Sequence, residues 1–155
     1  MKNTTLCYIE RDGAYLMLHK ASKKNDGNDG KWMGIGGHIE EKESPHDCIK
    51  REALEETGLT LIKPLYRGLV AFTSDKYETE LMHLFTCTEF SGEISSCPEG
   101  ELHWIDKSKV TDLPMWEGDR IFLDFLDTEK DFFSLKLTYK GDKAGRMEKR
   151  SLTVI

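Results

Sequence analysis

Near the N-terminus, the apolar positions fall in short runs bounded by polar residues, a pattern typical of β-strands. Two such runs, Thr4–Glu10 and Ala14–His19, are separated by the turn sequence Arg11-Asp12-Gly13, so they predict a β-hairpin. The polar, glycine-containing stretch Ala21–Gly30 predicts a loop. In Trp32–Ile39 three glycines stand among apolar residues, which indicates a strand or tight turn where the backbone approaches something closely.

Boundary signals then predict a helix. Ser44 can cap its N-terminus, Pro45 fits the first helical position, and Asp47 completes a capping-box pattern. The helix should continue to about Thr57 and end at Gly58, because glycine readily adopts the left-handed conformation found at helix C-termini.

The second half of the chain returns to strand-like patterns. Four segments predict strands: Leu61–Thr73, Leu81–Phe90, Leu102–Ile105 and Phe132–Tyr139. Asp119–Asp127 carries apolar residues at helical spacing and predicts a second amphipathic helix, while Gly141–Arg150 predicts a hairpin turn or a frayed tail. Mixed strands with two helices indicate a layered α/β or α+β fold, and residues 1–155 are expected to form one domain.

Composition narrows the class of protein. A formal net charge of -6 makes the chain a poor candidate for gripping a nucleic-acid backbone, whereas metal ions can still bring a small polyphosphate to an acidic site. Four cysteines without CxxC spacing indicate reduced core residues and argue against a zinc or redox motif. No apolar run has the length of a signal peptide or a membrane span, so we expect a cytoplasmic protein without a membrane partner. The sequence leaves the oligomeric state open.

The most informative feature is an acidic cluster within the predicted helix. Each helical residue advances by about 100°, so with Glu52 at zero, Glu55 falls near 300° and Glu56 near 40°. The three carboxylates therefore share an arc of roughly 100°. Like charges this close destabilise a helix, and a divalent cation removes the repulsion. Oxygen ligands without Cys or His favour a hard ion such as Mg²⁺, Mn²⁺ or Ca²⁺.

Other residues of this helix are predicted to hold the acidic cluster in place. Arg51 lies beside the acidic face and can pair with Glu55 or with Glu43, which would orient a carboxylate and keep it ionised. Three apolar residues on the other side are predicted to pack on the sheet: Leu54, Ala53 and Ile49.

A Glu-rich helix alone is also typical of a solvated surface, and Gly36-Gly37 of a simple turn. The wider spacing favours chemistry, because the stretch resembles the signature of the Nudix hydrolases: a Gly, five residues, a Glu, seven residues, Arg-Glu, an apolar residue, any residue, Glu-Glu, any residue, Gly and an apolar residue. Every fixed position is filled, by Gly37, Glu43, Arg51, Glu52, Ala53, Glu55, Glu56, Gly58 and Leu59.

The resemblance implies an α/β/α sandwich around a mixed β-sheet. It also implies that Mg²⁺, with Mn²⁺ as an alternative, is held by four groups: the carbonyl of Gly37 and the carboxylates of Glu52, Glu55 and Glu56. Glu43 and Arg51 would orient these carboxylates, and a metal-activated water would attack phosphorus.

The general base has two candidates. Members of this family use either a Glu of the signature or a Glu on a later loop. Glu56 is the first candidate, and Glu99 is the second. Glu99 can also be read as an exposed loop carboxylate.

Outside the signature, the chain resembles the branch of the family that hydrolyses oxidised purine nucleoside triphosphates such as 8-oxo-dGTP. Four segments carry this resemblance: Gly30–Gly37, Trp104-Ile105, Met115–Asp119 and Phe132-Phe133. By position, Trp116 would face the base and Asp119 would hydrogen-bond to it, since a carboxyl group accepts from N–H and, when protonated, donates to O6. Met33, Gly36 and Gly37 would also contact the substrate.

Two alternatives stay open for this second set of residues. Trp116 can be a core residue, and Asp119 can cap the helix Asp119–Asp127. The chain also departs from the mammalian enzyme of this branch, which has two adjacent Asp residues where this chain has Gly118-Asp119 and an Asn where it has Met33.

The expected function is therefore metal-dependent hydrolysis of a nucleoside triphosphate to a monophosphate and pyrophosphate, with oxidised purine nucleotides as substrates. One alternative is another Nudix activity, on ADP-ribose or a dinucleoside polyphosphate. Another is a Nudix-fold binding module that has lost catalysis.

Overall fold

The computed structural model describes residues 1–20, 30–128, 131–139 and 147–154. The strands are β1 (Lys2–Arg11), β2 (Ala14–Lys20), β3 (Trp32–Met33), β4 (Ile35–His38), β5 (Thr60–Leu61), β6 (Leu65–Ser74), β7 (Glu80–Cys87), β8 (Phe90–Ser91), β9 (Gly100–Asp106), β10 (Phe133–Tyr139) and β11 (Met147–Val154). The helices are α1 (Pro45–Thr57), α2 (Lys107–Val110) and α3 (Glu117–Thr128). None of the helices in these ranges is long and apolar enough to cross a bilayer.

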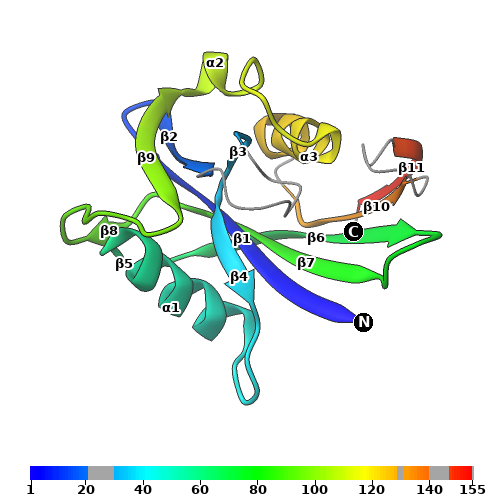
Figure 1. Cartoon of the computed structure of the whole chain (residues 1–155), viewed down its shortest axis with the longest axis horizontal. Coiled ribbons are helices and arrows are strands. Elements are labelled where there is room, and N and C mark those ends of the chain that lie inside the picture. Colours follow the sequence, from blue (N-terminus) through cyan, green and yellow to red (C-terminus); the bar gives the residue numbers. More distant parts are fainter. Residues whose placement is uncertain (21–29, 129–130, 140–146, 155) are drawn as a thin grey trace.

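A mixed sheet organises the molecule, with β1 at its branching point (Figure 1). Its main path runs β11-β10-β6-β7-β1-β2-β3, while β4 pairs with β1 and β9 pairs with β2. β1 is parallel to β7 along most of its length. On its other side, the first half of β1 pairs with β4 and the second half with β2, both antiparallel. The sheet therefore divides along β1, and β4 is held there by the first half of that strand.

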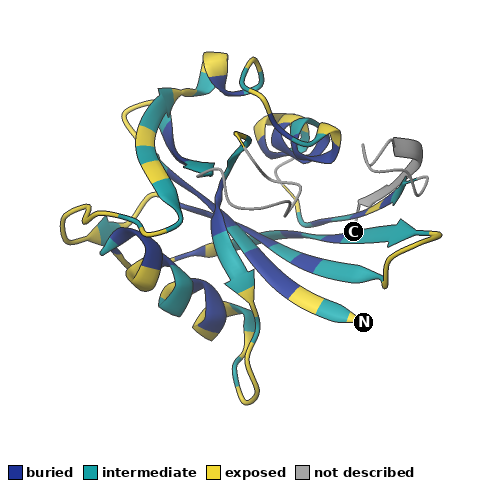
Figure 2. Cartoon of the chain, in the orientation of Figure 1, coloured by how far each residue is buried: buried dark blue, intermediate teal, exposed yellow. Residues whose placement is uncertain are grey.

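The two longer helices cover opposite faces of this sheet, as Figure 1 shows. Two sets of buried residues separate them, which appear as dark blue segments in Figure 2. The α3-side core includes Tyr8, Met17, Val70, Phe122 and Leu135. The α1-side core includes Cys7, Leu16, Ile35, Ile49 and Phe85. Helix, sheet and helix form three layers, so the predicted α/β/α sandwich around a mixed sheet is confirmed.

The predicted hairpin and first helix are confirmed at their boundaries. Asp12 and Gly13 both have positive φ, the geometry of the tight turn that joins β1 to β2. The Ser44 side chain accepts a hydrogen bond from the Asp47 N–H and the Asp47 side chain accepts one from the Ser44 N–H, so the capping box is complete. Helix α1 ends at Gly58, which is left-handed with φ 82°.

Two of the predicted strands are divided in the structure. The segment Leu61–Thr73 is interrupted before β6 at Pro64, which has no N–H to donate to a sheet, and the short strand β5 pairs with β8 in a separate two-stranded sheet. The segment Leu81–Phe90 is divided in the same way between β7 and β8.

The glycine-containing segment Trp32–Ile39, predicted as a strand or tight turn, forms two short strands, β3 and β4. Residues 21–29 of the predicted loop and residues 141–146 of the predicted turn lie outside the described residues. Met147–Arg150 begins β11, which pairs antiparallel with β10, so this part of the predicted turn or tail is a strand instead.

Tyr8 is expected to destabilise the α3-side core through its hydroxyl group. The side chain is fully buried between Tyr15 and Phe122, and its hydroxyl has no hydrogen-bond partner within the described residues. Tyr8→Phe is therefore expected to raise the free energy of unfolding by about 1 kcal/mol, because burial of an unpaired hydroxyl is unfavourable. Denaturant unfolding measures this change, and a loss of more than about 1 kcal/mol would instead mean that the hydroxyl is paired in solution.

Candidate functional site

The candidate site forms where α1 crosses the glycines of β4. A Cβ atom on Gly37 would lie 2.4 Å from Oε1 of Glu52, so only glycine lets this carboxylate rest against the strand. The N–H of Gly36 donates to Oε2 of Glu56 at 3.1 Å. Two of the three signature carboxylates are therefore held directly against the β4 backbone.

The predicted orientation of α1 needs one correction. Leu54 was expected to pack on the sheet, but 54% of this residue is exposed. Ile49 and Ala53 do pack there, and Glu56, which is only 7% exposed, lies beside them. Glu52 and Glu56 consequently border the core-facing side of the helix, because they reach toward β4 rather than toward open solvent.

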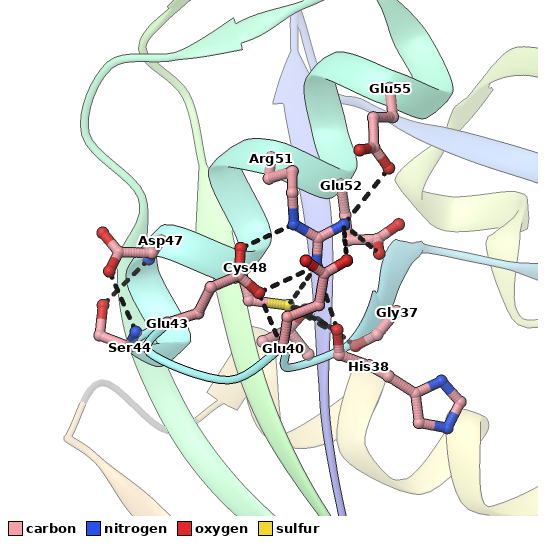
Figure 3. Close-up of polar contacts among 11 residues, drawn as sticks. Gly37, His38, Glu40, Glu43, Ser44, Asp47, Cys48, Arg51, Glu52 and Glu55 are labelled. Atoms are coloured by element: carbon pink, nitrogen blue, oxygen red, sulfur yellow. Dashed lines mark hydrogen bonds and ion pairs between the residues drawn. The ribbon is translucent and has the colours of Figure 1, made fainter.

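Arg51 joins several carboxylates into one network, shown in Figure 3. Its guanidinium makes two hydrogen bonds to Glu43, from Nε at 2.6 Å and from Nη2 at 2.9 Å. Nη1 donates to Glu52 at 2.9 Å and to Glu55 at 3.3 Å. Nη2 also donates to the backbone carbonyl of His38 at 3.1 Å. This planar fork fixes the loop after β4 and the helix carboxylates relative to each other.

The same contacts set the charge of Glu43. Hydrogen bonds from Arg51 and from the Glu40 N–H lower the pKa of Glu43 to about 2, so this carboxylate stays ionised at all physiological pH values. The pairing of Arg51 with Glu43 was one of the two predicted from sequence, and the structure shows both.

The third signature carboxylate is directed elsewhere. The Glu55 side chain is 59% exposed and turns toward Arg51 (Figure 3). Glu52 and Glu56 lie against β4 instead. No group of three Asp, Glu, His or Cys side chains among the described residues has the arrangement of a metal site. Glu55 belongs to the same helical face but must rotate away from Arg51 to join the other two.

Glu99, in the segment before β9, contacts Glu56 of the acidic cluster. Burial raises the pKa of Glu56 well above its usual range, and the adjacent Glu99 carboxyl group, within hydrogen-bonding reach, raises it further. Burial is also the main cause of the raised pKa of Glu52, although Arg51 opposes it. Lys20 lies 3.7 Å from Glu99 and adds a cation at this edge. The two proposed general bases are therefore adjacent to each other.

The residues expected to contact a base lie apart from this acidic cluster. Asp119 is 9% exposed, and its burial raises its pKa to about 7. It is the third residue of α3, so it does not occupy the N-cap position that the alternative interpretation required. Trp116 is half-buried, with Nζ of Lys31 4.4 Å from its ring centroid. Met33 packs against the α1-side core, whereas α3 covers the other core.

Sequence reasoning missed two polar residues near Asp119, which are Glu80 and Tyr139. Glu80 is close enough to raise the pKa of Asp119, and it accepts a hydrogen bond from Oγ1 of Thr4 at 2.7 Å. Glu80 alternates with the buried residues Met82 and Leu84 along β7, so a carboxylate on the core-facing side of a strand was the available signal.

Comparison with known proteins establishes the family. A family model described as the NUDIX domain matches residues 2–126, and the chain therefore belongs to the Nudix hydrolases. An uncharacterised Nudix hydrolase of Bacillus subtilis, YvcI, is 33% identical over 81% of this chain and 79% of its own. The oxidized purine nucleoside triphosphate hydrolase of Danio rerio is 32% identical, over 84% of this chain and 83% of its own.

Solved structures agree with this assignment. The crystal structure of a MutT protein from Bacillus halodurans superimposes with a TM-score of 0.87 and 27% identity, covering 98% of this chain and 97% of the other. The chain is thus a Nudix pyrophosphohydrolase. Enzymes of this family act on small nucleotide substrates and generally use divalent metal ions.

Proposed function

We propose that this protein hydrolyses a nucleoside triphosphate to a monophosphate and pyrophosphate with Mg²⁺, and that oxidised purine nucleotides such as 8-oxo-dGTP are its substrates. The observation that carries the proposal is the placement of Glu52 and Glu56 against the glycines of β4, with Glu99 beside them. The hydrolase of Danio rerio named above supports the substrate class. We also propose that residues 1–155 act as one domain.

The donor groups fit a magnesium ion. Glu52, Glu56 and the carbonyl of Gly37 supply oxygen only, which is the ligand type that Mg²⁺ prefers. Glu56 and Glu99 are carboxyl groups in mutual contact, and a bound cation would let both be ionised together. Glu55 completes the set after rotation from Arg51. When bound, divalent ions neutralise phosphate oxygens and make water easier to deprotonate. Mn²⁺ has the same ligand preference and is expected to substitute.

The chain's own residues would then orient and deprotonate the attacking water. Glu56 is fixed by the Gly36 N–H through Oε2, and it would accept the proton from water once a bound cation keeps it ionised. Glu99 lies within reach of the same position and is the second candidate for the base. Arg51 and Glu43 position Glu52 and need not contact the substrate.

Recognition of the base is assigned to the N-terminal end of α3. The Asp119 carboxyl can accept from an N–H of a purine and, because its pKa is raised to about 7, can also donate when protonated. Trp116, three residues before Asp119, offers a partly exposed aromatic surface. Gly36 contacts the acidic cluster through the hydrogen bond from its N–H to Glu56. Met33 is the weakest member of the proposed set, because its side chain packs toward the α1-side core.

Arg51→Lys tests the positioning role. Lysine keeps the charge but cannot form the two-pronged contact with Glu43 or reach Glu52 at the same time. We expect kcat to fall by about 10- to 100-fold, as is usual when a residue that orients metal ligands is lost. Stopped-time product assays across a Mg²⁺ titration measure this change. Lys50→Arg, at the neighbouring exposed position, is the control. Equal activity of Arg51→Lys and wild type would show that Arg51 does not position the carboxylates.

A substrate panel tests the proposed function. The values of kcat/KM and the products are compared for 8-oxo-dGTP, dGTP, dATP, ADP-ribose and a dinucleoside polyphosphate, with Mg²⁺ and with EDTA. The proposal requires 8-oxo-dGTP to lead and to yield a monophosphate and pyrophosphate only with metal. If another compound leads, the substrate class is wrong, and if none reacts, a binding role replaces catalysis.

A further inference from the structure

The contact between Gly118 and Tyr139 joins two elements that are distant in the sequence. A Cβ atom on Gly118 would lie 2.2 Å from the hydroxyl oxygen of Tyr139 and 3.0 Å from Cδ1 of Leu137. The Gly118 backbone also hydrogen-bonds to this hydroxyl. Glycine at the second position of α3 therefore allows a tyrosine of β10 to bring its hydroxyl to the first turn of the helix, next to Asp119.

Two tyrosines, Tyr8 and Tyr139, lie close enough to Asp119 to be affected by its charge. Its charge contributes to the raised pKa of Tyr8 and of Tyr139, after burial, which is the larger cause in both. Tyr8 is fully buried, whereas Tyr139 is only half-buried. No hydrogen bond joins the Asp119 side chain to another residue in the part of the chain that the structure describes. Of the two tyrosine hydroxyls near Asp119, only that of Tyr139 therefore belongs to a side chain that is open to solvent.

The hydroxyl of Tyr139 is suited to donate to such a ligand. Its oxygen accepts from the Gly118 N–H, which directs its proton away from the helix. The ring of Phe72 lies beside that of Tyr139, with 6.0 Å between their centroids. Glu80, whose charge also acts on Tyr139, is acceptor-only when ionised. Tyr139 therefore supplies a neutral donor where the neighbouring groups are carboxylates.

We infer that Tyr139 is a specificity-determining residue that donates a hydrogen bond to the C6 carbonyl of a 6-oxopurine while Asp119 accepts from the adjacent N1–H. This inference rests on the proposed function, because it places a purine at Asp119. A 6-aminopurine presents a donor at C6 and an unprotonated N1, so with Asp119 ionised neither of the two assigned contacts can form with adenine. The substrate class is thereby narrowed to 6-oxopurine nucleotides, the guanine and hypoxanthine types.

Binding of dIMP and dAMP, measured by calorimetric titration without metal, tests this inference. These two monophosphates differ only at the C6–N1 edge. Wild type is expected to bind dIMP more tightly than dAMP, and Tyr139→Phe is expected to reduce this preference by about 5- to 10-fold, the value of one neutral hydrogen bond. Tyr8→Phe is the matched control, since it removes the same group from the other neighbour of Asp119 and should leave the preference unchanged.

Two results overturn the inference. The first is a wild-type protein with no preference for dIMP, and the second is a preference that survives Tyr139→Phe. Neither result depends on the substrate panel, because the panel measures hydrolysis of triphosphates with metal. A protein that hydrolyses 8-oxo-dGTP but keeps its dIMP preference in Tyr139→Phe retains the proposed function and loses only the assignment of Tyr139.

Gly118→Ala provides a second measurement of the same contact. The added methyl group displaces the Tyr139 hydroxyl, so this variant is expected to lose the dIMP preference to the same extent as Tyr139→Phe. The double variant Gly118→Ala, Tyr139→Phe should show no further loss, because both changes remove one interaction. Additive losses would show that Gly118 and Tyr139 act separately and would overturn the assignment.

Discussion

Glu56→Gln is expected to lower kcat by about 10²- to 10⁴-fold without unfolding the protein, the range typical for loss of a positioned general base. The amide oxygen of glutamine can still accept from the Gly36 N–H, so α1 should keep its place against β4. The variant loses the negative charge that would bind a metal ion and accept a proton. Rapid-quench measurement of single turnovers gives the chemical step, and circular dichroism checks the fold.

Glu41→Gln is the matched control for this substitution. Glu41 is exposed in the loop before α1 and lies outside the acidic network. We expect its kcat to equal that of wild type. Near-normal turnover in Glu56→Gln would exclude Glu56 as both base and metal ligand and would leave Glu99 as the base to test.

We expect the wild-type protein to lose stability as the pH rises from about 4 to about 7, and we expect Asp119→Asn to abolish most of this loss. Burial raises the pKa of Asp119 to about 7 in the folded protein, from 3.8 when unfolded. The folded state therefore binds this proton more tightly than the unfolded state does. Its contribution is most favourable below pH 4 and is lost as the pH rises, by about 4 kcal/mol in total, since each pH unit corresponds to about 1.4 kcal/mol.

Denaturant unfolding at pH 4 and pH 8 in EDTA measures this effect. The difference in unfolding free energy between Asp119→Asn and wild type should be small at pH 4 and should favour the variant by about 4 kcal/mol at pH 8. Asp124→Asn, on the exposed side of the same helix, is the control and should show no such change. A parallel pH dependence in Asp119→Asn and wild type would mean that Asp119 is ionised in the folded protein at neutral pH.

Local sequence signals predicted the elements that are bounded by capping residues or turn residues. Ser44, Asp47 and Gly58 define α1 because capping depends on neighbouring residues only. The β1–β2 hairpin was predictable for the same reason. The break at Pro64 was missed because the apolar run continues through it, although proline carries its own signal against a continuous strand.

The helical wheel placed the carboxylates correctly relative to one another but not relative to the sheet. Leu54 is opposite the acidic arc, so it was expected to be inside. In the structure, Glu56 shares the inner side with Ile49 and Ala53, because its partner is the β4 backbone. The pattern of hydrophobic residues predicts which face of a helix is apolar. It cannot show that the inner side of α1 also meets polar backbone groups of β4, which bind Glu56.

Contacts between distant segments were beyond any local signal. Glu99 was singled out as a candidate base, but its contact with Glu56 depends on the path of the chain after β8. The contact between Gly118 and Tyr139 joins α3 to β10, and neither residue belongs to the signature. Such pairs follow from the topology of the sheet, which the sequence pattern of single elements does not specify.

The division of the sheet along β1 has a consequence for the order of folding. Helix α1 has complete caps and can begin to form from local interactions. The β4 glycines reach it only after β4 has paired with β1, and β1 is in turn parallel to β7, far along the chain. Contacts of such long range close slowly. The acidic helix should therefore be present before its site exists, and metal affinity should appear only with the last, cooperative step of folding.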